Sequence, residues 1–110
     1  MPLKRYCFAL DLKNDSQMMA EYEKHHKHVS PYIIESIKRA GIEVMDIYRV
    51  ENRLFMIMEV DESFSFERKK QMDENDPLVQ EWEALMLTYQ QELPSSNGEK
   101  WMLMNKIFEL

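Results

Sequence analysis

Hydrophobic residues recur at helical spacing between Asp15 and Ala40. When the segment is projected at about 100° per residue, one stripe faces a core. The stripe consists of Met19, Tyr22, His26, Val29, Ile33 and Ile37. Tyr22 and His26 are four residues apart, so their side chains lie one above the other on the same face. Pro31 predicts a kink or a break just after His26, which would open space beneath the helix.

Alternating and apolar runs elsewhere predict strands. Residues 4–13 alternate, with Tyr6, Phe8, Leu10 and Leu12 on one face. Residues 42–50 and 54–60 are two strand-like runs joined by a short turn, which predicts a hairpin. Residues 101–108 predict a closing strand, preceded by a loop at 94–98. Gly41 is expected to follow the C-terminal end of the first helical segment.

The stretch between the hairpin and the loop predicts two helices that are separated near Pro77. The element order is therefore β-α-β-β-α-β, the ferredoxin-like α+β arrangement of an antiparallel sheet with helices on one face. Residues 1–110 form a single domain in this interpretation. The opposite sheet face is apolar and uncovered, so we expect a homodimer that packs sheet to sheet.

The net charge and the composition of the chain limit which classes of partner it can bind. The chain has 110 residues and a formal net charge of −6, which opposes binding to nucleic acid or to an anionic membrane. No run approaches the roughly 20 apolar residues of a membrane span, and the N-terminus lacks the pattern of a signal peptide. We therefore expect a cytoplasmic protein. Its single cysteine, Cys7, is expected to be a buried and unreactive thiol.

Several classes of site are disfavoured. His25 and His28 have the i,i+3 spacing of metal ligands, but no third ligand is near, and a solvated helix face explains them better. Two glycines in the whole chain exclude the phosphate-binding glycine loops, and no nucleophile elbow is present. We predict neither a metal nor another cofactor.

His26 is the candidate that remains, because histidine both gives and takes protons near neutral pH. It could instead be a core histidine that is hydrogen-bonded to Tyr22 or to the backbone. Trp82 lies on the inward stripe of its helix; it either belongs to the core or packs its ring against a small ligand. Tyr48 and Arg5 are further candidates for the lining of the same pocket.

Four segments together resemble the L-rhamnose mutarotase family: YEKHH (22–26), IYRVENRLFMIMEV (47–60), QEW (80–82) followed by Met86, and the closing KIFEL (106–110). The resemblance covers nearly the whole chain. It implies a dimeric ferredoxin-like α+β barrel without a cofactor that interconverts the α and β anomers of a 6-deoxy-hexose. It also implies that His26 is the catalytic proton donor and that Tyr22 and Trp82 contact the monosaccharide.

Three positions differ from the family pattern. Ser30 replaces a tryptophan before the helix proline, Met45 replaces a tyrosine and Glu83 replaces a second tryptophan. L-fucose is therefore an alternative to L-rhamnose as substrate, with Glu83 as the additional hydroxyl acceptor. A cofactor-free monooxygenase or isomerase of the same barrel type would also fit this fold, and so would a non-catalytic module for small-molecule binding and dimerisation.

Overall fold

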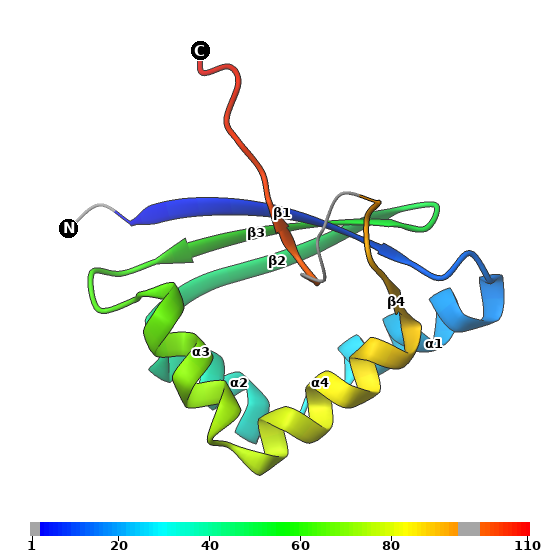
Figure 1. Ribbon diagram of the computed structural model, residues 1–110, viewed down its shortest axis with the longest axis horizontal. Helices are drawn as coiled ribbons and strands as arrows, with labels where there is room; N and C mark the ends of the chain where they lie inside the picture. Colours follow the sequence, from blue (N-terminus) through cyan, green and yellow to red (C-terminus); the bar gives the residue numbers. More distant parts are fainter. Residues whose placement is uncertain (1–2, 95–99) are drawn as a thin grey trace.

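A computed structural model describes residues 3–94 and 100–110 of the chain. Its elements are β1 (Lys4–Leu12), α1 (Ser16–Lys27), α2 (Pro31–Arg39), β2 (Ile42–Val50), β3 (Arg53–Val60), α3 (Phe66–Glu74), α4 (Pro77–Tyr89), β4 (Gln90–Gln91) and β5 (Met102–Leu103). The sheet order is β2-β3-β1-β4, with β5 also paired to β1, and every pairing is antiparallel. All the helices lie on one face of the sheet (Figure 1). The structure therefore has the predicted ferredoxin-like architecture.

The break between α1 and α2 follows from local capping. α1 ends at Lys27, and Ser30 caps α2 by accepting a hydrogen bond from the Tyr32 N–H at 3.2 Å. Pro31 occupies the first turn of α2, where its missing N–H removes no helix hydrogen bond. The predicted break is thus confirmed, and it separates the His26 turn from the remainder of the stripe.

Gly41 follows the end of α2 with φ +97°, a conformation that other residues rarely adopt. A Cβ at this position would lie 2.7 Å from both the Asp61 Oδ1 atom and the Ser63 Oγ atom. The expected helix-terminating role of Gly41 is therefore confirmed. It lets the chain turn directly into β2 beside the loop that follows β3.

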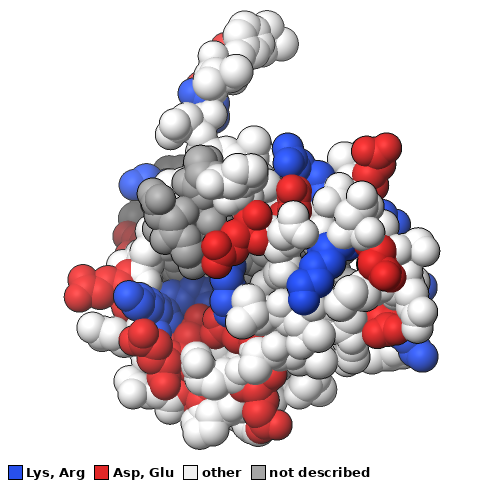
Figure 2. All heavy atoms as spheres, turned by 45° about the vertical axis from the view of Figure 1, so that its right-hand side comes forward, with Lys and Arg blue, Asp and Glu red and all other residues white. Residues whose placement is uncertain are grey.

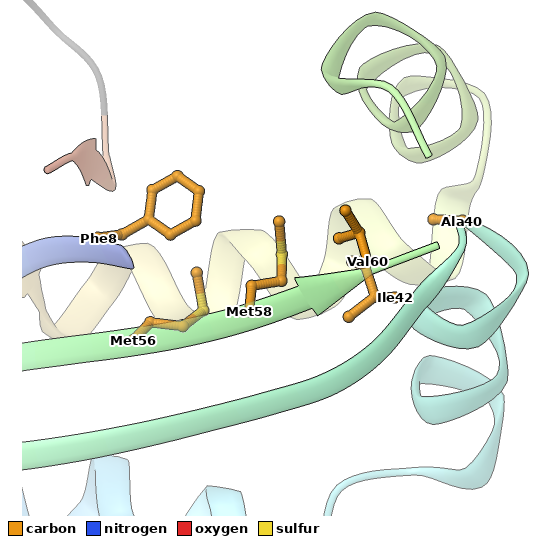
Figure 3. Packing of buried hydrophobic residues seen from close by; sticks show 6 residues of the cluster. All are labelled: Phe8, Ala40, Ile42, Met56, Met58 and Val60. Carbon is orange, nitrogen blue, oxygen red and sulfur yellow. The ribbon is translucent and has the colours of Figure 1, made fainter. Parts of the chain in front are cut away.

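The hydrophobic core consists of two clusters. One contains Phe8, Ala40, Ile42, Met56, Met58 and Val60. Figure 3 shows its strand residues pointing to the same side of the sheet. The second cluster contains Leu12, Tyr22, Leu54, Met86 and Tyr89. Strands β1 and β3 contribute to both clusters through alternate residues, as period-2 patterning requires.

The closing strand is much shorter than predicted. Only Met102–Leu103 pair with β1, and the residues after Met104 extend away from the sheet on the side opposite the helices (Figure 1). Ile107 is 95% exposed and Phe108 is 76% exposed, so these apolar side chains are not covered by the described part of the chain. Gln90–Gln91 form a short strand that was not predicted, and the expected loop at 94–98 lies mostly outside the described residues.

Cys7 is half-buried rather than buried as expected. The reason is strand alternation: Phe8 points to the helices, so Cys7 points to the opposite face, where it pairs with Ile57. Acidic and basic side chains are interspersed over the surface of the molecule seen in Figure 2. In the described part of the chain, no helix has both the length and the apolar character needed to cross a membrane.

Candidate active site

A cavity of about 1070 Å³ lies between the sheet and the helices and borders both core clusters. His26 and Lys27 at the end of α1, Val29 in the break, and Ile33 in α2 all line it. The helix break therefore opens the space that the sequence predicted. The cavity is large enough for a monosaccharide, because small-molecule sites are commonly about 300–1,000 Å³.

The two ring nitrogens of His26 are in different situations. Nδ1 lies 2.9 Å from the backbone carbonyl oxygen of Tyr22, one helical turn earlier. A carbonyl only accepts hydrogen bonds, so Nδ1 carries the proton and donates it, and the neutral ring keeps its lone pair on Nε2. Within residues 3–94 and 100–110, Nε2 makes no hydrogen bond, and the ring borders the cavity. The expected hydrogen bond between His26 and the backbone thus occupies only one nitrogen.

Tyr22 packs beside the histidine. Its ring centroid is 4.4 Å from that of His26, and the residue is only 3% exposed. Burial raises the pKa of Tyr22, and a hydrogen bond from Gln90 lowers it by less. The phenol therefore keeps its proton at neutral pH and offers the cavity a neutral hydroxyl group.

Trp82 reaches the same place from α4. Its ring lies edge-on to His26, with the ring centroids 5.5 Å apart, and it is half-buried at the cavity wall. The structure thus brings together the three predicted site residues, two from α1 and one from α4. An aromatic ring beside an imidazole gives an apolar surface next to a proton-transfer group, which suits a ring-shaped polar ligand.

Two of the three positions that depart from the family pattern lie at the cavity, and the third lies at the start of α2. Met45 and Glu83 line the cavity, whereas Ser30 serves as the cap of α2. The Glu83 carboxylate lies 3.8 Å from the Lys100 Nζ atom and accepts a 3.4 Å hydrogen bond from the Gln80 side-chain amide. Glu83 is therefore a charged acceptor on the cavity wall close to Trp82.

The side chains of the candidates Tyr48 and Arg5 both lie on the sheet face away from the helices. Tyr48 borders the cavity, but it stands opposite Phe55 on β3, and its ring packs against the Phe55 ring with the centroids 6.4 Å apart. Arg5 points to the same face and pairs with Glu59 at 3.0 Å. Strand alternation explains the error, because Arg5 is one residue out of phase with the inward-facing Tyr6.

His25 contacts a tyrosine side chain on α4. Its Nε2 atom lies 3.2 Å from the Tyr89 hydroxyl group, which donates to Glu21 at 3.1 Å. Among the residues that the structure describes, no group of three histidine, cysteine or carboxylate side chains is arranged to hold a metal ion.

Charged residues of both signs border the cavity: Lys27, Lys38, Lys69, Lys100, Glu43, Asp73 and Glu83. Lys69 pairs with Asp73, and Lys100 lies 3.8 Å from Glu83. A ligand that carries several phosphates needs an excess of positive charge, so this wall fits an uncharged molecule better.

Gln90, Lys100 and Trp101 are among the lining residues that sequence reasoning missed. Gln90 lies in the two-residue strand β4, and Trp101 lies just before the two-residue strand β5. Segments this short contain no periodic pattern that could indicate which side chains face inward.

Comparison with known proteins places the chain in a family. A family model described as L-rhamnose mutarotase matches residues 5–110. The chain belongs to the L-rhamnose mutarotase family. Members of this family are carbohydrate isomerases. Among curated proteins, an L-fucose mutarotase of Xanthomonas campestris pv. campestris is 41% identical to this chain over 113 residues. The match covers all of this chain and 90% of the relative.

Solved structures support the fold of this mutarotase-family chain. It resembles an L-rhamnose mutarotase from Formosa agariphila with a TM-score of 0.72 and 19% identity, over 97% of this chain and 98% of that one. It also resembles a dimeric ferredoxin-like protein from an uncultured marine organism, with a TM-score of 0.55 and 11% identity. That match covers 100% of this chain and 94% of the other.

Proposed function

We propose that this protein interconverts the α and β anomers of L-fucose or L-rhamnose, with His26 as the residue that moves the proton. In this reaction the anomeric hydroxyl loses a proton, the bond between C1 and the ring oxygen breaks, and the ring oxygen gains a proton. Rotation about the C1–C2 bond and reversal of these steps give the other anomer. General acid–base catalysis is therefore sufficient, and typically contributes about 10²–10⁴ in rate.

The free edge of His26 carries the proposal. Because the Tyr22 carbonyl holds Nδ1 at 2.9 Å, the proton that His26 exchanges with the sugar is the one on Nε2. The imidazolium form donates this proton to the ring oxygen, and the neutral form takes it back when the ring closes. A second group must accept the hydroxyl proton, and the carboxylates that line the cavity provide candidates.

Tyr22 and Trp82 are proposed as the sugar contacts. The Trp82 ring offers an apolar surface against which the C–H groups of a pyranose pack. The Tyr22 hydroxyl group stays protonated and is suited to hydrogen-bond a neutral sugar hydroxyl. The pairing of two lysines with carboxylates at the cavity wall supports an unphosphorylated sugar.

We infer that L-fucose is the better of the two substrates. The two sugars differ in configuration at C2 and C4, so each presents its hydroxyl groups to different partners. Glu83 replaces an aromatic residue of the family pattern with a hydrogen-bond acceptor on the cavity wall. The L-fucose mutarotase of Xanthomonas, 41% identical over the full length of this chain, supports the same choice.

Saturation-transfer NMR on the anomeric protons tests the proposal at equilibrium. The wild-type protein should transfer saturation between the anomers of L-fucose, and more slowly between those of L-rhamnose. D-Glucose serves as the control sugar and should show only its uncatalysed exchange. If neither deoxy-sugar exchanges faster than without protein, the proposal is wrong; if the sugars still bind, the chain is a binding module.

We also propose a homodimer that packs sheet to sheet. The sheet face away from the helices carries Cys7 and Ala9 of β1 beside Phe55 and Ile57 of β3. Ion pairs close this apolar strip at both ends, Arg5 with Glu59 at 3.0 Å and Arg53 with Asp11 at 2.7 Å. An apolar centre with a polar rim is typical of protein interfaces. The dimeric ferredoxin-like neighbour supports this assembly.

The exposed C-terminal residues support the same dimer. They leave the sheet on the side of the proposed interface, and Ile107 and Phe108 belong to neither core cluster of the described chain. A second copy that covers the strip would meet them.

The cytoplasm is the proposed location. The one cysteine, Cys7, has no partner for a disulfide within the chain, which fits a reducing compartment. Immunoblotting of fractionated cells for the native protein tests this, and recovery outside the cytoplasmic fraction would contradict it.

A further inference from the structure

The side chain of Gln90 is buried beside the cavity with one end of its amide unpaired. Gln90 begins β4 directly after α4, and its backbone pairs with Leu12 of β1. It is 8% exposed and lines the cavity. The Oε1 atom is buried without a hydrogen-bond partner in the described part of the chain, the only such side-chain atom there.

The opposite end of the amide has one long contact. The Gln90 Nε2 atom donates to the Tyr22 hydroxyl group at 3.4 Å. If the amide were turned over, Nε2 would be the unpaired end instead, so one polar end is free in either orientation. Proteins rarely bury an unpaired amide group, and an exception calls for an explanation such as a bound ligand.

We propose that the free end of the Gln90 amide binds a hydroxyl group of the sugar and helps to determine which sugar is accepted. This inference rests on the proposed function, because it assigns a ligand contact to the same cavity. A hydroxyl group both donates and accepts, so it pairs with either end of the amide. It also pairs with the adjacent phenol of Tyr22, whose ring is 4.4 Å from the ring of His26.

The pair formed by Gln90 and Tyr22 selects for a neutral hydroxyl group. Both side chains are uncharged and almost fully buried, so they cannot compensate a phosphate or a carboxylate. A buried site built to hydrogen-bond a hydroxyl group discriminates strongly against an analogue that lacks it, because its own polar group is then left unpaired. Gln90 therefore distinguishes sugars by the presence and orientation of one hydroxyl group.

The test compares wild type and Gln90→Met with the parent sugars and their monodeoxy analogues. The Kd values come from NMR titration of L-fucose, L-rhamnose and each analogue. Methionine keeps the length of the side chain and removes both polar ends. The expected result is a Kd for the parent sugar that is about ten-fold higher in Gln90→Met, which corresponds to one lost hydrogen bond.

One monodeoxy analogue should identify the hydroxyl group. It should bind wild type about ten-fold more weakly than the parent sugar does, and should bind Gln90→Met no more weakly than wild type. The matched control is Gln91→Met, the neighbouring exposed residue of β4, which should leave every Kd unchanged. If every analogue shows the same ratio of Kd values between the two proteins, Gln90 binds no hydroxyl group and the inference is overturned.

A second measurement needs no substitution. The Gln90 side-chain amide resonances of the wild-type protein should shift when the sugar binds. Sugar binding that leaves these resonances in place would overturn the inference even if Gln90→Met fails to fold.

The rate of anomeric exchange distinguishes a failure of this inference from a failure of the proposed function. Exchange with unchanged Gln90 resonances refutes only the role of Gln90; Gln90-dependent binding without exchange refutes only catalysis. A wild-type protein that binds none of the sugars refutes both.

Discussion

His26 combines a fixed orientation with a free reactive edge. Its Nδ1–H group donates a hydrogen bond to the Tyr22 carbonyl oxygen. The ring centroids of Tyr22 and Trp82 lie 4.4 Å and 5.5 Å from the ring centroid of His26. These contacts restrict rotation of the ring, so Nε2 stays at the cavity wall without a conformational search. Orientation of this kind is what lets a single imidazole act as an efficient proton donor and acceptor.

Tyr22→Phe tests the sugar contact without removing the ring beside His26. We expect Kd for the sugar to rise about ten-fold, because one hydrogen bond to the ligand is lost. The exchange rate at saturating sugar should fall much less, because the backbone carbonyl that orients His26 is unchanged. NMR titration and saturation transfer measure the two quantities, and an unchanged Kd would contradict the proposed contact.

Glu83→Trp tests the choice of sugar. It replaces the carboxylate with the aromatic residue of the family pattern, so we expect the ratio of exchange rates to shift from L-fucose toward L-rhamnose. Saturation transfer with both sugars at equal concentration measures the shift. Glu81→Trp, at an exposed position of the same helix, is the control and should leave the ratio unchanged. An unchanged ratio in Glu83→Trp would remove the role assigned to Glu83.

Sequence periodicity was sufficient to place Tyr22 and His26 on one helix face and Trp82 on the inward face of another helix, and the family resemblance supplied the grouping of the three in one site. Periodicity was insufficient for Gln90, whose inward position depends on the pairing of two residues with β1. A hydrogen bond between His26 and the backbone could be anticipated from the helix, but periodicity cannot show which ring nitrogen makes it. That depends on the side-chain rotamer.

At the scale of elements, the break between α1 and α2 shapes the cavity. Ser30 and Pro31 begin α2 immediately after the break, so the cap determines where the second helix starts. We expect Ser30→Ala to lower the free energy of unfolding by about 1 kcal/mol, because the cap hydrogen bond to Tyr32 is lost. Urea denaturation measures the change, and Ser30→Thr, which keeps a capping hydroxyl group, should lose much less.

Asp76 caps α4 and links it to α2. It accepts hydrogen bonds from the Tyr32 hydroxyl group at 2.7 Å and from the N–H groups of Leu78 and Val79. The Tyr32 bond is the largest cause that lowers the pKa of Asp76, and the two backbone bonds lower it further. A lowered pKa in the folded state stabilises the protein above the ordinary aspartate pKa of about 4. This stabilisation is lost as the pH falls through the lower, folded-state value.

We therefore expect Asp76→Asn to lower Tm at pH 7 and to lose this disadvantage progressively below pH of about 4. Tyr32→Phe should show a smaller version of the same pH dependence, because it removes only one of the hydrogen bonds. Thermal denaturation from neutral to acidic pH measures both variants. A Tm difference that stays constant with pH would show that the Asp76 charge contributes nothing.

The long elements could be predicted because their patterns extend over eight or more residues. The closing strand was overestimated for a different reason. Residues 105–110 contain apolar side chains typical of a strand, but their backbone pairs with no neighbouring strand among the described residues, and the last backbone hydrogen bond to β1 is that from Met104 to Cys7. A strand requires a partner in space, which a local pattern does not supply.

At the scale of the whole molecule, the sheet face that carries Ile57 is the proposed dimer interface. We expect a wild-type dimer with twice the 13.3 kDa mass of one chain. Ile57→Lys should give a folded monomer, because it places a charge at the apolar centre of the proposed interface. Sedimentation equilibrium measures the mass, and Lys4→Ala, near the end of β1, is the control. A monomeric wild type, or a dimeric Ile57→Lys, would contradict sheet-to-sheet packing.

The most direct test of whether the His26 imidazole moves the proton is the rate of anomeric exchange in His26→Gln. Saturation transfer with L-fucose at neutral pH measures this rate. We expect exchange to slow by about 10²–10⁴ relative to wild type, toward the uncatalysed rate. His28→Gln, an exposed histidine at the end of α1, should exchange at the wild-type rate. A folded His26→Gln protein that also exchanges at the wild-type rate would show that His26 is not the catalytic group.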